Sequence, residues 1–310
     1  MTIFNPSSAF LDPRIQYGES ITKTLNAEET PVFIKELKKN AELKICGSLS
    51  RTTFNEIIEA IKNSYCFFSL DFTKTQGLKR IRNRAFYHCK NLYSIKLPDS
   101  IQEIGKEAFM WNTNLCYVEF GKGAYILKKR AFAHCSTLEK IMIDTCVSIG
   151  DEVFYCCDSL QSIKIPESVQ TIGKFVFQDC KNLIEITVDE DNNFYTAENR
   201  VLYDKNKTTL IHYPANKTDI HFEIPDTVKE IERWAFSGNK YICGIKIPKS
   251  VEHIGDWAFQ GCESLEGGTI ENEKLKPNIS VFAGCFYGCE CIKADEKFVR
   301  QVKDSFSKNK

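Results

Sequence analysis

A repeat of about 23 residues occupies most of the chain and constrains the fold more than any other feature of the sequence. A leucine or isoleucine opens each unit, and the register resumes after one interruption. A unit this short cannot bury all its apolar groups alone, so successive units must stack into an elongated array. The opening residues, 22 or 23 positions apart outside the interruption, are Leu92, Leu115, Leu138, Leu160, Leu183, Ile242 and Leu265.

Each unit approximates the pattern L-x-x-I-x-I-P-x-S-V-x-x-I-G-x-x-A-F-x-x-C. The alternation at its start, as in Ile163-Lys164-Ile165, predicts a strand with one buried face. The proline that follows, such as Pro166, cannot donate a ladder hydrogen bond and ends the strand. The A-F-x-x-C segment predicts a tight helical turn that directs a phenylalanine inward. About nine coils, with strands about 4.8 Å apart, would form a curved rod about 40–45 Å long.

These motifs, in register over about residues 67–294, resemble the BspA-type, or Treponema pallidum-type, leucine-rich repeats. The resemblance implies an α/β solenoid with a parallel sheet on its concave face. It also implies a surface antigen or adhesin of a host-associated microbe, which binds extracellular-matrix or other host proteins.

The repeats define the central of three regions. Residues 1–66 form an N-terminal region, in which residues 1–25 are expected to be irregular. An αβαβ cap should follow, with helices at about 28–40 and 52–62 and strands at 43–47 and 67–72, because an open solenoid end is both an apolar patch and a strand edge. Residues 67–294 form the solenoid. Residues 295–310 form a C-terminal capping helix and tail.

An insertion at about residues 189–218 replaces the A-F-x-x-C segment of the coil that begins at Leu183. Alternating residues on either side of 204–207 predict a β-hairpin that projects from the rod. The hairpin is either a structural variation packed on the convex side or a specific contact surface. In the second case its aromatic anchors would be Phe194, Tyr195, Tyr203 and Tyr213.

Six of the fourteen cysteines fall in one column, three residues after the consensus phenylalanine. Asparagine occupies two positions of this column, and asparagine could replace neither a nucleophilic thiol nor a metal-bound thiolate. We therefore predict a buried structural ladder of free thiols and amides. Its members are Cys89, Asn112, Cys135, Cys157, Cys180, Asn239, Cys262 and Cys289.

No catalytic, cofactor or metal site is expected, because no known catalytic or nucleotide-binding motif occurs. His88 and His134 lie two coils apart, about 10 Å, too far for one zinc ion with bonds of about 2.0–2.3 Å. The 41 basic and 41 acidic residues balance, which gives no general reason to bind nucleic acid. No apolar run approaches the roughly 20 residues of a membrane-spanning helix. Without a signal peptide the chain would be cytoplasmic as written, or at the cell surface if a leader was removed.

The outward positions of each coil's first strand are the best candidates for function, because they vary between coils and mix charges. Such a lattice is typical of an extended protein-binding surface, although a simply solvated sheet face is the alternative. We expect a monomeric, non-catalytic protein-interaction module, with an intracellular leucine-rich repeat scaffold as the alternative. The candidate contacts are Lys96, Tyr117, Glu119, Lys140, Met142, Lys164, Glu185 and Lys246, with Tyr195 and Tyr203 from the insertion.

Overall fold

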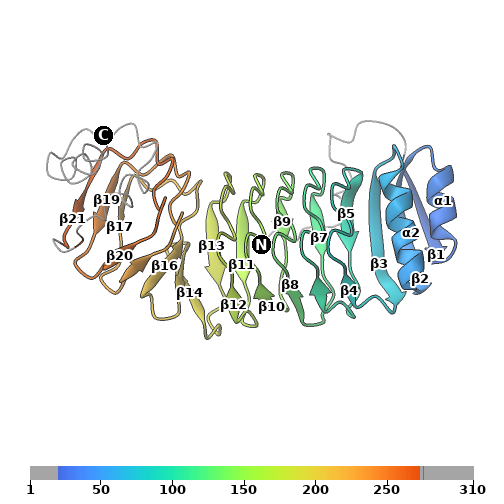
Figure 1. The fold of residues 1–310 in the computed structure, drawn as a ribbon, viewed down its shortest axis with the longest axis horizontal. Coiled ribbons are helices and arrows are strands. Elements are labelled where there is room, and N and C mark those ends of the chain that lie inside the picture. Colours follow the sequence, from blue (N-terminus) through green and yellow to red (C-terminus); the bar gives the residue numbers. More distant parts are fainter. Residues whose placement is uncertain (1–19, 273–274, 276–310) are drawn as a thin grey trace, which may run out of the picture.

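A computed structural model describes residues 20–272 and 275 of the chain. Figure 1 shows an elongated, curved molecule in which two rows of strands run along its length. The N-terminal end consists of β1 (Ser20–Asn26), α1 (Thr30–Glu36), β2 (Asn40–Ser48), α2 (Arg51–Lys62) and β3 (Phe68–Gln76). The predicted C-terminal capping helix and Cys289 lie outside the described residues.

The N-terminal cap is a β-α-β-α-β unit, longer by one strand than the sequence predicted. Helix α2 begins after Ser50, whose hydroxyl accepts a hydrogen bond from the Thr53 N–H at 3.0 Å. Its apolar face, including Phe54 and Ile57, is buried against the sheet. The expectation that residues 1–25 are irregular was wrong for residues 20–25, because β1 pairs in parallel with β2. The polar sequence of this exposed edge strand lacks the alternation that would have revealed it.

The first row of strands contains the leading strand of every coil and follows the inner side of the curve (Figure 1). Within this row every hydrogen-bonded pair of strands is parallel. The strands form three hydrogen-bonded groups, which run from β1 to β9, from β11 to β13 and from β17 to β21. The described residues contribute eleven strands to this row rather than about nine, because β1 and β2 extend it. The later members are β5 (Leu92–Lys96), β7 (Tyr117–Glu119), β9 (Lys140–Ile141), β11 (Ser162–Ile165), β13 (Glu185–Val188), β17 (His221–Glu223), β19 (Gly244–Ile247) and β21 (Gly267–Ile270).

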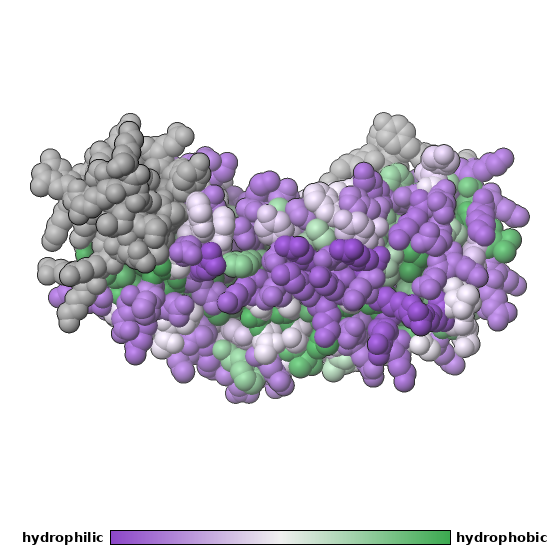
Figure 2. Space-filling model, in the orientation of Figure 1, coloured by the Kyte–Doolittle hydropathy of each residue, from purple (hydrophilic) through white to green (hydrophobic). Residues whose placement is uncertain are grey.

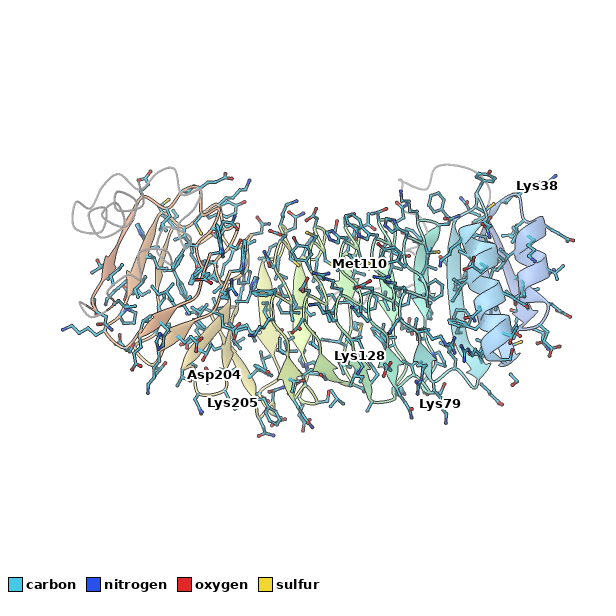
Figure 3. All side chains as sticks on the ribbon, viewed as in Figure 1. Lys38, Lys79, Met110, Lys128, Asp204 and Lys205 are labelled. Atoms are coloured by element: carbon cyan, nitrogen blue, oxygen red, sulfur yellow. The ribbon has the colours of Figure 1, made fainter. Side chains whose placement is uncertain are left out.

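The second row holds the shorter strand of each coil. Its first sheet has the order β12-β10-β8-β6-β4, and its second has the order β14-β15-β16-β18-β20. The row comprises β4 (Arg80–Ile81), β6 (Glu103–Ile104), β8 (Tyr125–Leu127), β10 (Cys146–Ile149), β12 (Thr171–Ile172), β14 (Tyr195–Glu198), β15 (Val201–Asp204), β16 (Thr209–His212), β18 (Glu230–Ile231) and β20 (His253–Ile254). Side chains project outward all along both rows (Figure 3).

The consensus phenylalanines form a stack that runs through the core between the rows. The rings of Phe86, Phe109 and Phe132 are separated by 5.0 Å between centroids and are nearly parallel. Phe154 and Phe177 continue the stack at 6.0 and 5.9 Å. Each ring packs on the rings of neighbouring coils, so burial of one phenylalanine depends on the next coil.

The A-F-x-x-C segment consists of consecutive turns rather than the helical turn that we expected. Two residues in each such segment adopt a left-handed backbone, for example Arg130 (φ 56°) and His134 (φ 61°). The consensus glycine has a different role. A Cβ at Gly173 would lie 2.4 Å from the Asp151 backbone nitrogen, so close contact between neighbouring coils requires glycine there.

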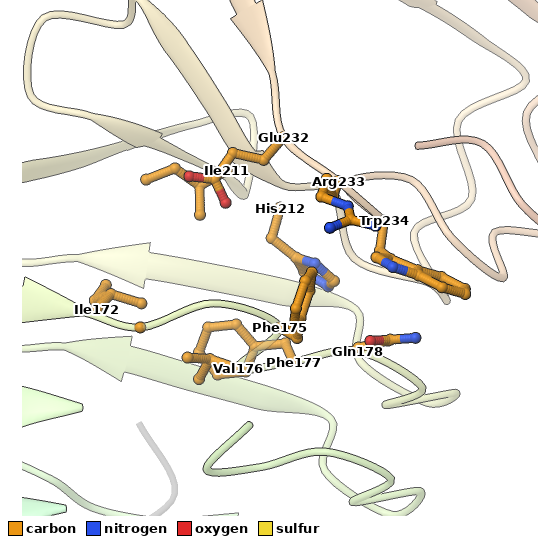
Figure 4. A pocket seen from close by; sticks show the side chains of 11 residues that line it. Ile172, Phe175, Val176, Phe177, Gln178, Ile211, His212, Glu232, Arg233 and Trp234 are labelled. Carbon is orange, nitrogen blue, oxygen red and sulfur yellow. The ribbon is translucent and has the colours of Figure 1, made fainter. Parts of the chain in front are cut away.

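Residues 183–223, which we call the joint, interrupt the solenoid. The buried core falls into two clusters that meet within the joint, where Leu202 belongs to the first and Val201 and Tyr203 belong to the second. His212 stands at the end of the first phenylalanine stack, tilted by 50° against Phe177, and Tyr213 begins the second stack against Phe236. Figure 4 shows His212 turned toward Phe175 and Phe177, beside a cavity of about 20 Å³. The insertion therefore joins the two stacks through a tilted ring contact beside a small cavity.

Candidate functional site

The outward side chains of the first row form columns across the coils, as the strand register shows. Tyr117 lies between Ser94 and Lys140, and Lys96 lies beside Glu119. Further along, Ser162 lies beside Glu185, Lys164 beside Thr187, and Glu223 beside Lys246. Most of the face in Figure 2 is hydrophilic, with small scattered hydrophobic areas.

A cluster around Tyr117 is the most varied part of this surface. The Tyr117 hydroxyl donates to Glu119 Oε2 at 3.0 Å, and Lys96 Nζ lies 3.2 Å from the same oxygen. Burial, followed by the charge of Glu119, raises the pKa of Tyr117 to about 12, so its hydroxyl is a neutral donor at physiological pH. Lys140 is exposed on the next strand, and the Met142 side chain is 46% exposed. An apolar, an aromatic and several charged groups thus share one patch.

The other predicted contacts of the first row are ion-paired. Lys164 Nζ lies 2.7 Å from Asp189 Oδ2, and this hydrogen bond raises the pKa of Lys164. Glu185 pairs with Arg200 at 3.4 Å. Exposed pairs of this kind contribute only about 0–1 kcal/mol, so a partner can replace them at small cost.

A second ionic group spans β17, β19 and the residue after β21. Lys246 Nζ lies 3.6 Å from carboxylate oxygens of both Glu223 and Glu271. The charge of Glu223, followed by that of Glu271, raises the pKa of Lys246. One ammonium group thus serves two carboxylates.

The structure contradicts two of the proposed aromatic anchors in the insertion. The Tyr203 side chain is 1% exposed and that of Tyr213 is 0% exposed, so both belong to the core. Tyr195 is half-buried, and its hydroxyl oxygen accepts a hydrogen bond from the Ile172 N–H at 2.8 Å. Phe194 alone remains largely exposed, at 48%. The hairpin predicted around residues 204–207 is present, because β15 and β16 pair antiparallel, but it does not project: Val201, Leu202 and Tyr203 of β15 are all buried in the core.

The Cys/Asn column is buried in every described coil. The thiols of Cys135, Cys157, Cys180 and Cys262 each lie 3.0–3.2 Å from the carbonyl oxygen of the aligned phenylalanine in the preceding coil. Burial raises the pKa of the Cys135, Cys157 and Cys180 thiols, which keeps each sulfur protonated. The eleven cysteines in the described residues form no disulfide bond.

The imidazole rings of His88 and His134 stack on opposite sides of the Trp111 ring, with centroid separations of 5.6 and 3.8 Å. Residues 20–272 and 275 contain no group of three or more side chains arranged to hold a metal ion.

Sequence reasoning missed a polar cluster in the joint. Asp219 occupies the leading-leucine position, 23 residues before Ile242, and accepts a hydrogen bond from the Tyr213 hydroxyl at 2.9 Å. The Lys217 ammonium group is buried beside it and pairs with its carboxylate. The signal was present in the repeat register, which places an aspartate where the other described coils have leucine, isoleucine or phenylalanine.

Two hollows flank β17 on the first-row face. The first, of about 520 Å³, lies between β13 and β17 and is lined by residues that include Ile184, Arg200 and Phe222. The second, of about 510 Å³, extends over β19 and β21, where Gly244 and Gly268 carry no side chain. Both hollows open on the face that carries the candidate contacts of the first row.

A model of the BspA type leucine rich repeat region matches six copies over residues 35–145, 79–209 and 215–307. The chain is a BspA-type leucine-rich repeat protein. No curated protein matches this BspA-type chain. None of the helices in the described ranges is long and apolar enough to cross a membrane.

Solved structures share the BspA-type fold. The chain is 26% identical to a leucine-rich repeat protein from Eubacterium ventriosum, with a TM-score of 0.58, and the match covers 73% of this chain and 66% of that one. It is 24% identical to the pneumococcal vaccine antigen PcpA, with a TM-score of 0.52, and the match covers 75% of this chain and 51% of that one. The match thus spans just under two thirds of the first relative and about half of the second.

Proposed function

We propose that this protein is a non-catalytic protein-binding module that engages its partner through the outward side chains of the first row. The observation that carries the proposal is the patch formed by Tyr117, Lys140 and Met142 on adjoining strands. Aromatic and flexible apolar side chains bordered by exchangeable ion pairs are the usual composition of binding hot spots.

We further propose that this protein acts at a microbial surface and binds a host protein there, such as a component of the extracellular matrix. The resemblance to BspA-type antigens and adhesins supports this part of the proposal. The shared fold with a pneumococcal vaccine antigen agrees with it.

The test measures binding of the purified chain to immobilised, purified extracellular-matrix proteins by biolayer interferometry. The triple variant Y117A/K140A/M142A should bind at least 30-fold more weakly, since truncating hot-spot residues costs about 2 kcal/mol or more. The matched control is K79A/Q170A/K229A, which removes three exposed side chains outside the first row. Equal binding by both variants would refute the assignment of the contact patch.

A further inference from the structure

The hydrogen-bonded ladder of the first row stops between β13 and β17. It is also interrupted between β9 and β11, but those two strands still lie side by side. Strand β13 pairs only with β11, and β17 pairs only with β19, among the described strands. The joint therefore leaves a strand edge on each side of an internal gap. An unpaired edge presents a row of backbone donors and acceptors that can accept a further strand.

The direction of the ladder bonds identifies which groups of β17 face the gap. The Ile224 N–H donates to the Lys246 carbonyl at 3.0 Å, and the Ile220 carbonyl accepts from the Cys243 N–H at 2.8 Å. Residues 220, 222 and 224 thus point toward β19. Because successive residues of a strand alternate, the backbone N–H and C=O groups of His221 and Glu223 point into the gap.

The opposite edge, that of β13, is partly closed by the joint itself. The Ile186 N–H donates to the Arg200 carbonyl at 3.1 Å, and the Leu183 carbonyl accepts from the Asn216 N–H at 2.8 Å. These bonds use groups that an added strand would need. The edge of β17 is therefore the receptive one.

The first hollow lies directly along this edge. Its volume is about 520 Å³, and its lining includes the apolar side chains of Ile184 and Phe222 together with polar groups. An added strand places its side chains alternately on the two faces of the sheet. Those directed inward would meet Ile184 and Phe222, and those directed outward would stand beside His221 and Glu223.

The charges around the hollow favour a basic strand. Arg200 is matched by Glu185, and Lys217 by Asp219. Glu223 is matched less well, because its partner Lys246 lies equally close to Glu271 and the Glu223 side chain is 77% exposed. A lysine or arginine beside Glu223 would supply the missing positive charge.

We propose that the edge of β17 binds an extended peptide segment of a protein partner, which adds to the first row as a strand. The segment alternates small apolar residues, directed toward Ile184 and Phe222, with lysine or arginine, directed outward beside Glu223. This inference deepens the proposed protein-binding function and rests on it, since it specifies one class of partner segment.

The test uses fluorescein-labelled hexapeptides, acetylated and amidated at the ends, and measures fluorescence anisotropy with the full chain. The parent probe is Lys-Val-Lys-Val-Lys-Val. Two further probes carry N-methyl groups on either the valine or the lysine amides. In a strand parallel to β17 the valine amides face its edge, and in an antiparallel strand the lysine amides do. The parent should bind, and one of the two methylated probes should bind at least tenfold more weakly.

A charge exchange supplies the second measurement. E223K should weaken binding of the Lys-Val probe at least tenfold and strengthen binding of a Glu-Val-Glu-Val-Glu-Val probe. The matched control E252K changes an exposed glutamate outside the first row and should leave both affinities unchanged. No parent binding, equal binding of all three Lys-Val probes, or equal effects of E223K and E252K would each overturn the inference.

The variant Y117A/K140A/M142A separates this inference from the proposed function. It should retain full affinity for the Lys-Val probe, because its substitutions lie on β7 and around β9, away from β17. Loss of peptide binding in this variant would overturn the assignment to the β17 edge. Capture of matrix proteins by a chain that binds no peptide would overturn the inference and leave the proposed function standing.

Discussion

Asn112 and Asn239 occupy equivalent positions of the buried column, yet their amides are satisfied very differently. The Asn112 Nδ2 donates to the carbonyls of Phe86 and Phe109, both at 2.6 Å, but its Oδ1 is buried and finds no hydrogen-bond partner among the described residues. The Asn239 Oδ1 accepts from the N–H groups of Tyr241 and Ile242, both at 2.9 Å. Cysteine should therefore have opposite effects at the two positions.

A buried acceptor without a hydrogen bond destabilises the folded state by about 1–3 kcal/mol, and the variant N112C removes this acceptor. A thiol there can still donate to the Phe86 carbonyl, as Cys135 does to the Phe109 carbonyl at 3.1 Å. Both carbonyls also keep backbone donors, from Cys89 and Asn112 itself. Loss of the second amide bond costs about 1 kcal/mol, so N112C should stabilise the protein by about 1 kcal/mol.

The variant N239C leaves the N–H groups of Tyr241 and Ile242 without their acceptor and also removes the Nδ2 bonds to Pro214, Ala215 and Lys217. We expect it to destabilise the protein by about 3 kcal/mol. The assay is urea unfolding in reducing buffer, followed by circular dichroism. With a slope of about 2–3 kcal/mol per molar, N112C should raise the midpoint by about 0.3–0.5 M and N239C should lower it by about 1 M or more. A lower midpoint for both variants would refute the reasoning.

Four further predictions concern the joint and the coil packing. Burial lowers the pKa of His212 to about 4, so below about pH 6.5 the unfolded state binds a proton that the folded state does not. His212 should therefore contribute a loss of stability of up to about 3 kcal/mol between pH 6.5 and 4, measured as the difference between the wild type and H212L in urea titrations. Burial raises the pKa of Glu232 to about 7, so the folded state holds the extra proton there, and E232Q should remove a loss of stability that develops as the pH rises from 4.5 to 7. G173A should cost about 3 kcal/mol or more because its Cβ meets backbone atoms at 2.4–2.5 Å, whereas G238A, which has open space but φ +76°, should cost about 1 kcal/mol. C180S should cost about 1 kcal/mol and leave matrix-protein binding unchanged, because the Phe154 carbonyl, 3.0 Å from the thiol, remains as an acceptor; altered binding with unchanged stability would contradict this.

The repeat register predicted most of the fold because each coil supplies the same information several times. The alternation at Ile163-Lys164-Ile165 predicted both the strand and its buried face, and β11 pairs in register with β13 as stacking requires. The outward direction of Lys96, Tyr117 and Lys164 follows from the same alternation. Repetition also supported assignment of the chain to the BspA-type family, which the family model shows.

Features that occur once were predicted poorly. Tyr203 lies in an alternating segment, from which a projecting hairpin was inferred, but both faces of β15 pack into the core, with Leu202 in one cluster and Tyr203 in the other. Strand β1 was missed because its polar sequence owes its conformation to β2. The gap beside β17 depends on how residues 183–223 fold back on the coil, and no pattern in the sequence specifies that path.

The joint also bears on how the rod responds to mechanical force. Along each half, the stacked phenylalanines and the ladder of strands resist separation of neighbouring coils together. At the joint the ladders of both rows stop, whereas between β9 and β11 only the first-row ladder does, and the ring contact between Phe177 and His212 is tilted by 50°. A tension applied between the two ends should therefore open the molecule there first. The solenoid would yield as two stiff segments connected by the β14–β16 hairpins, and the gap beside β17 would widen before any coil unfolds.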